Sequence, residues 1–185
     1  MLQITRFTTG YRSKLILEIY QHWLKGKERV LDVGCGDGIM SSIIGKHFGV
    51  QLTGCDIENY LKISIPFSLM QSGSTLPFKK NAFGWVMFND VFHHMSYKNQ
   101  SLLLQEALRV GQRVLIFEVE PTLAGGFADF IINKFHNISM PVPLTFRTHE
   151  EWIGLFHTLN VSCTYIQPKR PFFYPFSHES FMIRR

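Results

Sequence analysis

The chain has 185 residues, of which 45% are hydrophobic and 18% charged, so it can bury a core of its own, and we expect one domain spanning 1–185. Its formal charge of +5 comes from Lys and Arg residues spread along the sequence, which argues against a nucleic-acid-binding surface because such a surface needs a dense basic stripe. No run reaches the roughly 18 apolar residues of a membrane-spanning helix, while peripheral contact with a membrane surface is compatible with the composition.

The cysteines and the N-terminal residues favour a cytoplasmic location. Cys35, Cys55 and Cys163 are too few and too scattered for a disulfide framework, and no CxxC pair indicates zinc. Residues 1–10 are polar and lack the apolar segment of a signal peptide. We therefore expect a protein of the reducing cytoplasm without a metal centre.

The first half of the chain alternates between helical and strand-like patterns. Apolar residues recur at three- and four-residue spacing over 12–24, which predicts a helix with one apolar face. Apolar runs at 29–33, 50–55 and 85–89 predict buried strands. A helix between the first two strands is expected to stop at Gly49. Strands that alternate with helices in this way form a parallel sheet, so the fold class is predicted as α/β.

Helix caps mark the elements of the second half. Ser96 can cap a helix that Gly111 closes, and the run at 113–118 predicts a strand behind it. Thr148 and Glu151 have the spacing of a capping box and precede an amphipathic helix. The last two predicted strands cover 161–166 and 181–184.

Three glycines follow the first predicted strand directly. Gly34, Gly36 and Gly38 lack side chains, so a ligand can approach the backbone, and the helix behind them points its N-terminus at that ligand. Asp56 ends the next strand, 24 positions after Asp32, where a carboxylate can bind ribose hydroxyls. The loop therefore predicts a site for a dinucleotide or an adenosyl ligand.

The spacing of the glycines separates these two ligands. A dinucleotide fingerprint has its third glycine three residues after the second, a position that Ile39 fills here. A side chain as large as that of Ile39 would spoil the close packing of helix and strand that the dinucleotide fingerprint requires. A nicotinamide-dependent oxidoreductase is therefore the weaker alternative.

Further segments follow the loop in a recognisable order. They are Gly-Cys-Asp-Ile at 54–57, Leu-Pro-Phe at 76–78, Phe-Asn-Asp-Val-Phe-His-His at 88–94, and a helix leading into a strand at 106–118. This ordered set covers about residues 25–120 and resembles the class I S-adenosylmethionine-dependent methyltransferases, specifically the group called type 11.

The resemblance implies a Rossmann-like, doubly wound and mostly parallel seven-stranded sheet, with helices on both faces and an antiparallel last strand. It also implies S-adenosyl-L-methionine as the cofactor, with Asp56 on the ribose hydroxyls and Ile57 and Val91 beside the adenine. Asn89 and Asp90 are expected where the sulfonium meets the acceptor. The residues it places at the cofactor are Asp32, Gly34, Cys35, Gly36, Gly38, Asp56, Ile57, Ser72, Asn89, Asp90 and Val91.

Two positions depart from the pattern of this group. Its members commonly have an acid before the Leu-Pro-Phe turn that contacts the adenine amine, a contact that Ser72 or a backbone carbonyl must make here. They also have an aspartate where this chain has Gly84. These departures leave open a second alternative, a scaffold protein that binds S-adenosylmethionine without turnover.

Methyl transfer from a sulfonium is an in-line displacement, so the protein mainly aligns the reacting atoms, and no catalytic metal is expected. A general base helps when the acceptor atom is protonated. His94 and Glu118 are the catalytic candidates, with His93 the weaker one, because each lies near a predicted carboxyl end of a strand, where open α/β sheets bind ligands. Simple packing of His94 and a solvated carboxylate at Glu118 remain the structural alternatives.

The connector at 121–147 is long and rich in glycine and aromatic residues, and such loops are often lids. Our hypothesis is that it covers a small-molecule or lipid-like acceptor, with Arg147, Trp152 and the aromatic run 172–174 as further walls. For most of these aromatic residues, packing in the core is the alternative. DNA adenine methylation is disfavoured, because no Asn-Pro-Pro-aromatic motif follows the strand at 85–89.

Overall fold

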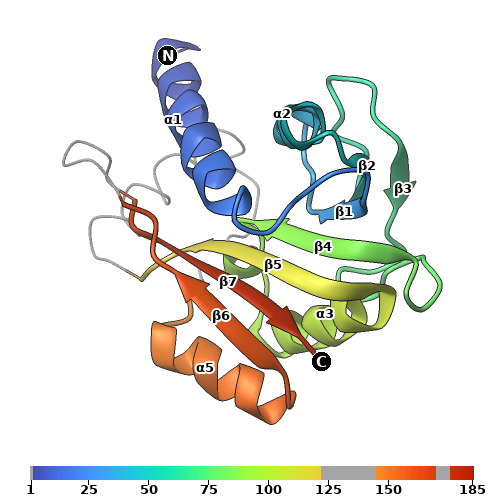
Figure 1. Ribbon diagram of the computed structural model, residues 1–185, viewed down its shortest axis with the longest axis vertical. Helices are drawn as coiled ribbons and strands as arrows, with labels where there is room; N and C mark the ends of the chain where they lie inside the picture. The colour runs from blue at the N-terminus through green and yellow to red at the C-terminus, as the bar shows by residue number, and fades with distance from the viewer. Residues whose placement is uncertain (1, 122–144, 170–175) are drawn as a thin grey trace.

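A seven-stranded sheet forms the centre of the computed structural model, which describes residues 2–121, 145–169 and 176–185 (Figure 1). The strand order is β3-β2-β1-β4-β5-β7-β6. All neighbours pair in parallel except β7, which is antiparallel to both β5 and β6. The strands are β1 (Arg29–Val33), β2 (Gln51–Asp56), β3 (Phe67–Leu69), β4 (Phe83–Asn89), β5 (Gly111–Val119), β6 (Ser162–Ile166) and β7 (His178–Arg184). The predicted doubly wound sheet with an antiparallel last strand is confirmed.

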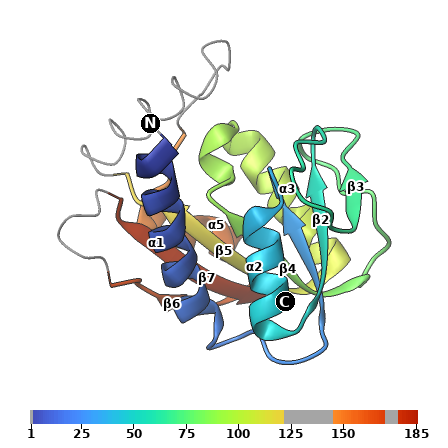
Figure 2. The same ribbon diagram turned by 90° about the horizontal axis from the view of Figure 1, so that it is seen from above.

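Helices cover both faces of this sheet. Helices α1 (Leu2–Tyr20) and α2 (Ile39–Phe48) lie on one face, and α3 (Tyr97–Val110) and α5 (His149–Thr158) lie on the other (Figure 1). Figure 2 shows α1 and α2 crossing the same face of the sheet from above. A single 3₁₀ turn, η1 (Phe92–His94), joins β4 to α3. None of the described helices is long and apolar enough to cross a membrane.

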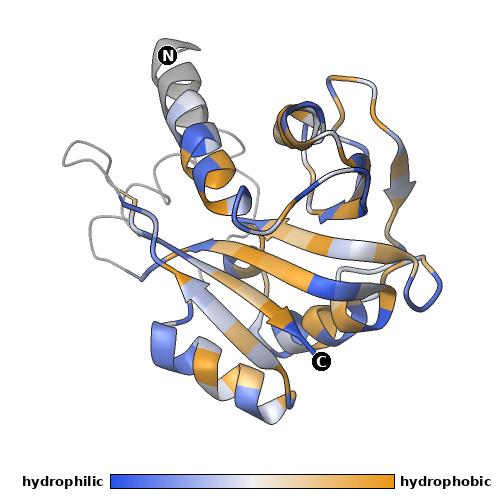
Figure 3. Ribbon diagram, viewed as in Figure 1, coloured by the Kyte–Doolittle hydropathy of each residue, from blue (hydrophilic) through white to orange (hydrophobic). Residues whose placement is uncertain are grey.

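Each face of the sheet has its own apolar core because successive side chains of a strand point to opposite faces. On β4, Met87 packs with the α1 and α2 side, while Phe88 packs with the α3 and α5 side. Both side chains are fully buried, and burial of this kind stabilises the fold by about 1.5–3 kcal/mol for each large apolar side chain. Figure 3 shows the resulting apolar colouring along the central strands.

The predicted helix caps are confirmed. The Ser96 hydroxyl accepts a hydrogen bond from the backbone N–H of Asn99, and Thr148 and Glu151 form a capping box. Helix α2 ends at Gly49, which has φ 67°. Helix α1 begins well before the predicted residue 12 and ends at Tyr20 rather than at residue 24. The sequence patterns predicted neither the short edge strand β3 nor the turn η1.

Candidate active site

The glycine loop leads from the carboxyl end of β1 into α2 and is fixed by contacts of its backbone. Gly34 has φ 73°, and a Cβ at this position would lie 2.6 Å from Cγ2 of Val91. The backbone N–H of Gly34 donates a 2.8 Å hydrogen bond to the carbonyl of Cys55 at the end of β2. A Cβ at Gly36 would meet no atom within 4 Å, so the middle of the loop borders open space. A ligand can therefore approach the backbone there.

Asp56 at the end of β2 faces this loop. Its Oδ2 accepts a 2.8 Å hydrogen bond from the N–H of Gly36, and its Oδ1 accepts a 2.7 Å bond from the N–H of Ile57. Burial raises the pKa of Asp56, and the two backbone donors oppose that rise. Each carboxylate oxygen can accept a second hydrogen bond. The side chain of Ile57 is 55% exposed, which gives the carboxylate an apolar neighbour at the surface.

A chain of buried hydrogen bonds lies beneath the loop. The Ser41 hydroxyl donates to Asp32 at 2.6 Å, and the amide of Asn89 donates to the other oxygen of Asp32 at 3.2 Å. The Tyr20 hydroxyl of α1 donates in turn to Oδ1 of Asn89 at 2.8 Å. Burial raises the pKa of Asp32 to about 6, against the lowering effect of the bonds from Ser41 and Asn89. The side chains of Asp32 and Asn89 thus join the ends of β1 and β4 to two helices.

Asp90, directly after β4, carries a network of charges. It has φ 58°, and its Oδ2 lies 2.5 Å from Nε of Arg12 on α1. Its Oδ1 lies 3.4 Å from Nε2 of His178 on β7. Although burial raises the pKa of Asp90, the charge of Arg12 and then that of His178 outweigh this effect and hold the pKa well below its usual range. Asp90 is therefore ionised at neutral pH.

Glu118, a predicted catalytic residue, lies with only 3% exposure at the end of β5. Its Oε1 accepts hydrogen bonds from the N–H groups of Val91 and Phe92, at 2.5 and 2.7 Å. Its Oε2 lies 2.8 Å from Nδ1 of His93. The carboxylate thus caps the start of η1 and orients His93, which itself is buried and stacks on Phe146 with ring centroids 5.2 Å apart.

His94, the other predicted catalytic residue, has a more exposed side chain than its neighbour His93. The two ring centroids are 4.0 Å apart. Partial loss of hydration, followed by the effect of His93, lowers the pKa of His94 to about 4. The imidazole is therefore neutral at pH 7 and can accept a proton.

Of the remaining predicted site residues, Cys35 and Gly38 belong to the glycine loop, whereas Ser72 lies outside it. Cys35 lies inside the glycine loop, where burial, followed by the charges of Asp32 and Asp56, raises the pKa of its thiol to about 12. Gly38 precedes α2 with φ 78°. Ser72 is exposed and forms an isolated bridge with Thr75, at a distance along the chain from the loop.

The predicted acceptor walls are only partly described. Most of the lid at 121–147, and the aromatic run 172–174, lie outside the described residues. Trp152 lies in the core on the α3 and α5 side with 2% exposure. Arg147 lies over the rings of Tyr97 and Trp152, at 4.7 and 5.6 Å from their centroids. Trp152 thus takes the packing role that was the alternative for these aromatic residues.

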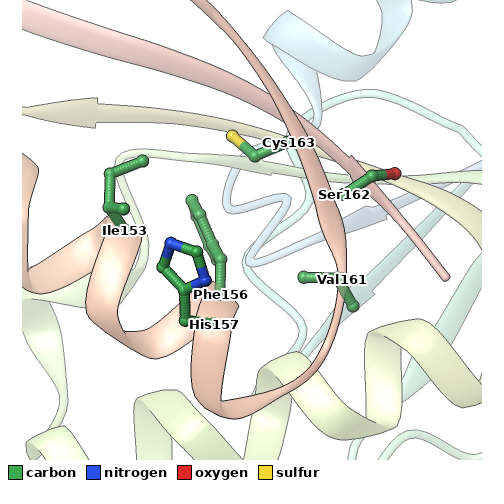
Figure 4. A pocket seen from close by; sticks show the side chains of 6 residues that line it. All are labelled: Ile153, Phe156, His157, Val161, Ser162 and Cys163. Atoms are coloured by element: carbon green, nitrogen blue, oxygen red, sulfur yellow. The ribbon is translucent and has the colours of Figure 1, made fainter.

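Several polar residues of the site were not foreseen from the sequence. They reach it from distant elements, and no local spacing signals them: Arg12, Tyr20, Ser41, His149, His178 and Glu179. A separate cavity of about 320 Å³ opens between α5 and the amino end of the edge strand β6 (Figure 4). It is lined by Ile153, Phe156, His157, Val161, Ser162 and Cys163.

The comparisons with known proteins agree with this geometry. The family model described as "Methyltransferase domain" matches residues 31–114, which include the glycine loop, Asp56 and the start of β5. This match covers less than half of the chain, and the fold of the whole chain is that of the class I S-adenosylmethionine-dependent methyltransferases. No curated protein matches the chain.

Solved structures similar to this chain have low sequence identity and therefore bear on its fold alone. Magnesium protoporphyrin IX methyltransferase from Synechocystis PCC 6803, with bound SAH, is 15% identical with a TM-score of 0.64, over 97% of this chain and 83% of that one. The 1,6-didemethyltoxoflavin-N1-methyltransferase of Burkholderia thailandensis is 15% identical with a TM-score of 0.70, over 94% and 77%. The [4+2]-cyclase SpnF is 16% identical with a TM-score of 0.69, over 94% and 80%.

The residues of the candidate site fit S-adenosylmethionine, the cofactor of the class I methyltransferases. Open space at Gly36 leaves room for the ligand against the backbone, and Asp56 keeps acceptor capacity for two hydroxyl groups. The exposed side chain of Ile57 offers an apolar surface beside that carboxylate. These features suit a ligand that combines a ribose with a flat apolar ring.

Proposed function

We propose that this protein is a methyltransferase that moves the methyl group of S-adenosylmethionine to a small-molecule or lipid-like acceptor by in-line displacement. The observation that carries the proposal is the pairing of Asp56 with the open backbone at Gly36, at the edge where the parallel strands end. Ligands of open α/β sheets bind at this edge. Two of the similar structures support an organic acceptor, since their names specify magnesium protoporphyrin IX and 1,6-didemethyltoxoflavin.

The residues of the site would divide the work between binding and alignment. The cofactor supplies the electrophilic methyl group when it is bound. Gly36 and Asp56 would hold its methionine and ribose parts, and Ile57 and Val91 would flank the adenine. Asp90 would border the acceptor, with its charge held by Arg12 and its backbone aimed by the left-handed conformation. Most of the barrier would be lowered by alignment of the reacting atoms.

Proton removal falls to His94 in this proposal. Its pKa near 4 keeps the imidazole unprotonated at neutral pH, so it can accept a proton from a hydroxyl or an amine as the methyl group arrives. Glu118 would act as a positioning residue, since its oxygens hold the turn η1 and His93. The proposal further includes a cytoplasmic location and a lid at 121–147.

Isothermal calorimetry with S-adenosylmethionine and S-adenosylhomocysteine tests cofactor binding. Asp56→Asn replaces one acceptor oxygen by an amide donor and is expected to weaken binding roughly 10- to 100-fold, because charge-assisted hydrogen bonds are lost. Glu58→Gln is the matched control, a neighbouring exposed carboxylate that bonds to Tyr60 and should leave binding unchanged. Folded wild-type protein that gives no heat with either ligand would overturn the proposal.

A non-catalytic scaffold that binds S-adenosylmethionine is the second candidate. The departures at Ser72 and Gly84 favour it, and so does the likeness to SpnF, a protein of this fold that is named as a cyclase. Incubation of the protein with labelled S-adenosylmethionine and a metabolite extract separates the two candidates. Transfer of label supports the enzyme, whereas binding without transfer to any component supports the scaffold.

Deletion of residues 123–140 tests the proposed lid. Cofactor binding and methyl transfer should be measured separately on the shortened protein. We expect cofactor binding to persist and transfer to fall, because the acceptor would lose its cover. Unchanged transfer would remove the lid from the proposal without affecting the cofactor site.

A further inference from the structure

Two glutamates face each other on the α3 and α5 side of the sheet. Glu118 on β5 and Glu179 on β7 are register partners in an antiparallel pair, so their side chains share one face with Cβ atoms about 5 Å apart. Each is only 3% exposed. Two buried carboxylates in this arrangement repel each other unless neighbouring groups compensate their charge.

Each of these glutamates has a histidine partner. His93 lies 2.8 Å from Glu118, and His149 at the start of α5 lies 2.8 Å from Oε1 of Glu179. The two pairs differ in one respect. Both oxygens of Glu118 have hydrogen-bond partners, whereas Oε2 of Glu179 is buried and has none among the described residues.

An unpartnered carboxylate oxygen of this kind is costly, because it has lost its hydration without gaining a protein donor. The surroundings of Glu179 compensate its burial only in part. Burial raises the pKa of Glu179, the hydrogen bond and the charge of His149 oppose the rise, and the charges of Glu120 and Glu150 add a smaller rise. Tyr165 packs edge-on against His149 with ring centroids 4.7 Å apart, and burial followed by the charge of the nearby Glu179 raises the pKa of its hydroxyl to about 12. The described part of the chain does not arrange these side chains as a metal site.

We infer that Glu179 and His149 bind a hydrogen-bond donor, a hydroxyl or an amine, at the end of the methyl acceptor that is remote from the reacting atom. This inference rests on the proposed function. The donor would supply the missing partner of Glu179. The side chain of His149 is 39% exposed and so gives access from the surface, at the end of α5 that lies beside the carboxyl end of β5 (Figure 1). Nδ1 of His149 contacts Glu179, which leaves Nε2 to face a ligand.

The position of Glu179 sets the size and the charge of this acceptor. Strands β4 and β7 are separated by β5, and two strand spacings amount to about 10 Å. An acceptor that reaches from the end of β4 to Glu179 therefore has about the length of a two-ring molecule. An anionic group at the remote end of the acceptor is disfavoured, because the carboxylates of Glu118 and Glu179 would repel it.

A labelled-transfer experiment on the full chain tests the inference. A metabolite extract is separated by ion exchange into cationic, neutral and anionic pools, and each pool is incubated with methyl-labelled S-adenosylmethionine. We expect label in the cationic or the neutral pool. Glu179→Gln should reduce transfer at limiting acceptor roughly 10- to 100-fold, mainly through KM, and should leave cofactor binding by calorimetry unchanged.

Two further variants make the outcome decisive. Glu18→Gln is the matched control, since this exposed carboxylate lies on α1, on the other face of the sheet, and it should transfer at the wild-type rate. His149→Gln changes the other residue proposed to bind the acceptor, which is partly exposed, and tests the same contact if Glu179→Gln fails to fold. The proposed contact at Glu179 and His149 alone would be overturned if neither of these two variants lowers transfer, or if label is confined to the anionic pool. Cofactor binding without transfer of label to any pool would overturn the proposed methyl transfer, and with it the proposed contact at Glu179 and His149.

Discussion

Nε of Arg12 on α1 lies 2.5 Å from Oδ2 of Asp90, 78 residues further along the chain. The same guanidinium donates a 2.7 Å hydrogen bond to the backbone carbonyl of Asn89. This contact fixes the N-terminal helix to the end of β4, where the acceptor is expected. A half-buried cation that holds a largely buried carboxylate contributes to stability as well as to geometry.

Arg12→Met should lower the free energy of unfolding at pH 7 by about 1–3 kcal/mol, since Asp90 would lose its main partner while solvent screens part of the loss. The pKa of Asp90 is held below its usual range in the folded state, so this stabilisation exists above the ordinary pKa of an aspartate and is lost as the pH falls through the lowered value. Urea denaturation should therefore find a smaller gap between wild type and variant near pH 3. A gap that does not change with pH would contradict the assignment.

A pair of glycine variants should separate stability from cofactor binding. Gly34→Ala requires an alanine at φ 73° and places Cβ 2.6 Å from Val91, so unfolding should become easier by about 2–4 kcal/mol. Gly36→Ala meets no protein atom within 4 Å and should cost only about 1 kcal/mol. It should nevertheless weaken S-adenosylmethionine binding at least 10-fold, because the methyl group enters the space left for the ligand. Equal calorimetric affinity of Gly36→Ala and wild type would count against that use of the space.

Glu118 offers a test of structural against catalytic use of a carboxylate. Glu118→Ala leaves three buried donors without an acceptor and should destabilise the fold by roughly 3–5 kcal/mol. Glu118→Gln retains an oxygen for the two backbone N–H groups and should cost about 1 kcal/mol or less. Thermal melts and labelled transfer should be compared for the two variants. A well-folded Glu118→Gln protein that loses transfer completely would make Glu118 a catalytic base after all.

Much of the fold could be predicted because its signals are local. Gly49 ends α2 and Thr148 begins α5, as the spacing of caps and apolar residues predicts. The edge strand β3 has three residues, which is too short for a periodic pattern, and η1 is a single turn held by Glu118 from another strand. Such elements form through tertiary contacts that no window of sequence contains.

The candidate site follows the same division. The glycine loop and Asp56 could be predicted because chain order alone brings strand ends together at one edge of the sheet. Arg12 and Glu179 could not, because α1 and β7 reach that edge from opposite ends of the chain. Their partners, the carboxylate of Asp90 and the imidazole of His149, meet them only through the crossing of helices and the antiparallel register of β7.

The buried pair of Asp32 and Ser41 predicts an unusual dependence of stability on pH. The folded pKa of Asp32 is raised to about 6, so the folded state binds more protons than the unfolded state between about pH 4 and 6. The contribution of Asp32 to stability should therefore decrease as the pH rises through this range. Comparison of wild type with Asp32→Asn by urea denaturation at pH 5 and pH 8 measures it. The free energy of unfolding of wild type, relative to that of Asp32→Asn, should be higher at pH 5 than at pH 8. A higher relative value at pH 8 would contradict the raised pKa.

The ionisation of His94 sets the expected dependence of the transfer rate on pH. Since its pKa is lowered to about 4, the imidazole is already unprotonated across the neutral range, and a base of this kind gives a rate that is flat above pH 5 and falls only below it. His94→Gln should reduce transfer about 10²- to 10⁴-fold with acceptors that carry a proton on the reacting atom, and cofactor affinity should not change. His22→Gln is a control for loss of an exposed imidazole distant from η1 along the chain. A rate that rises through pH 6.5, near the pKa of an unperturbed histidine, would assign the proton to another group and leave His94 with a packing role.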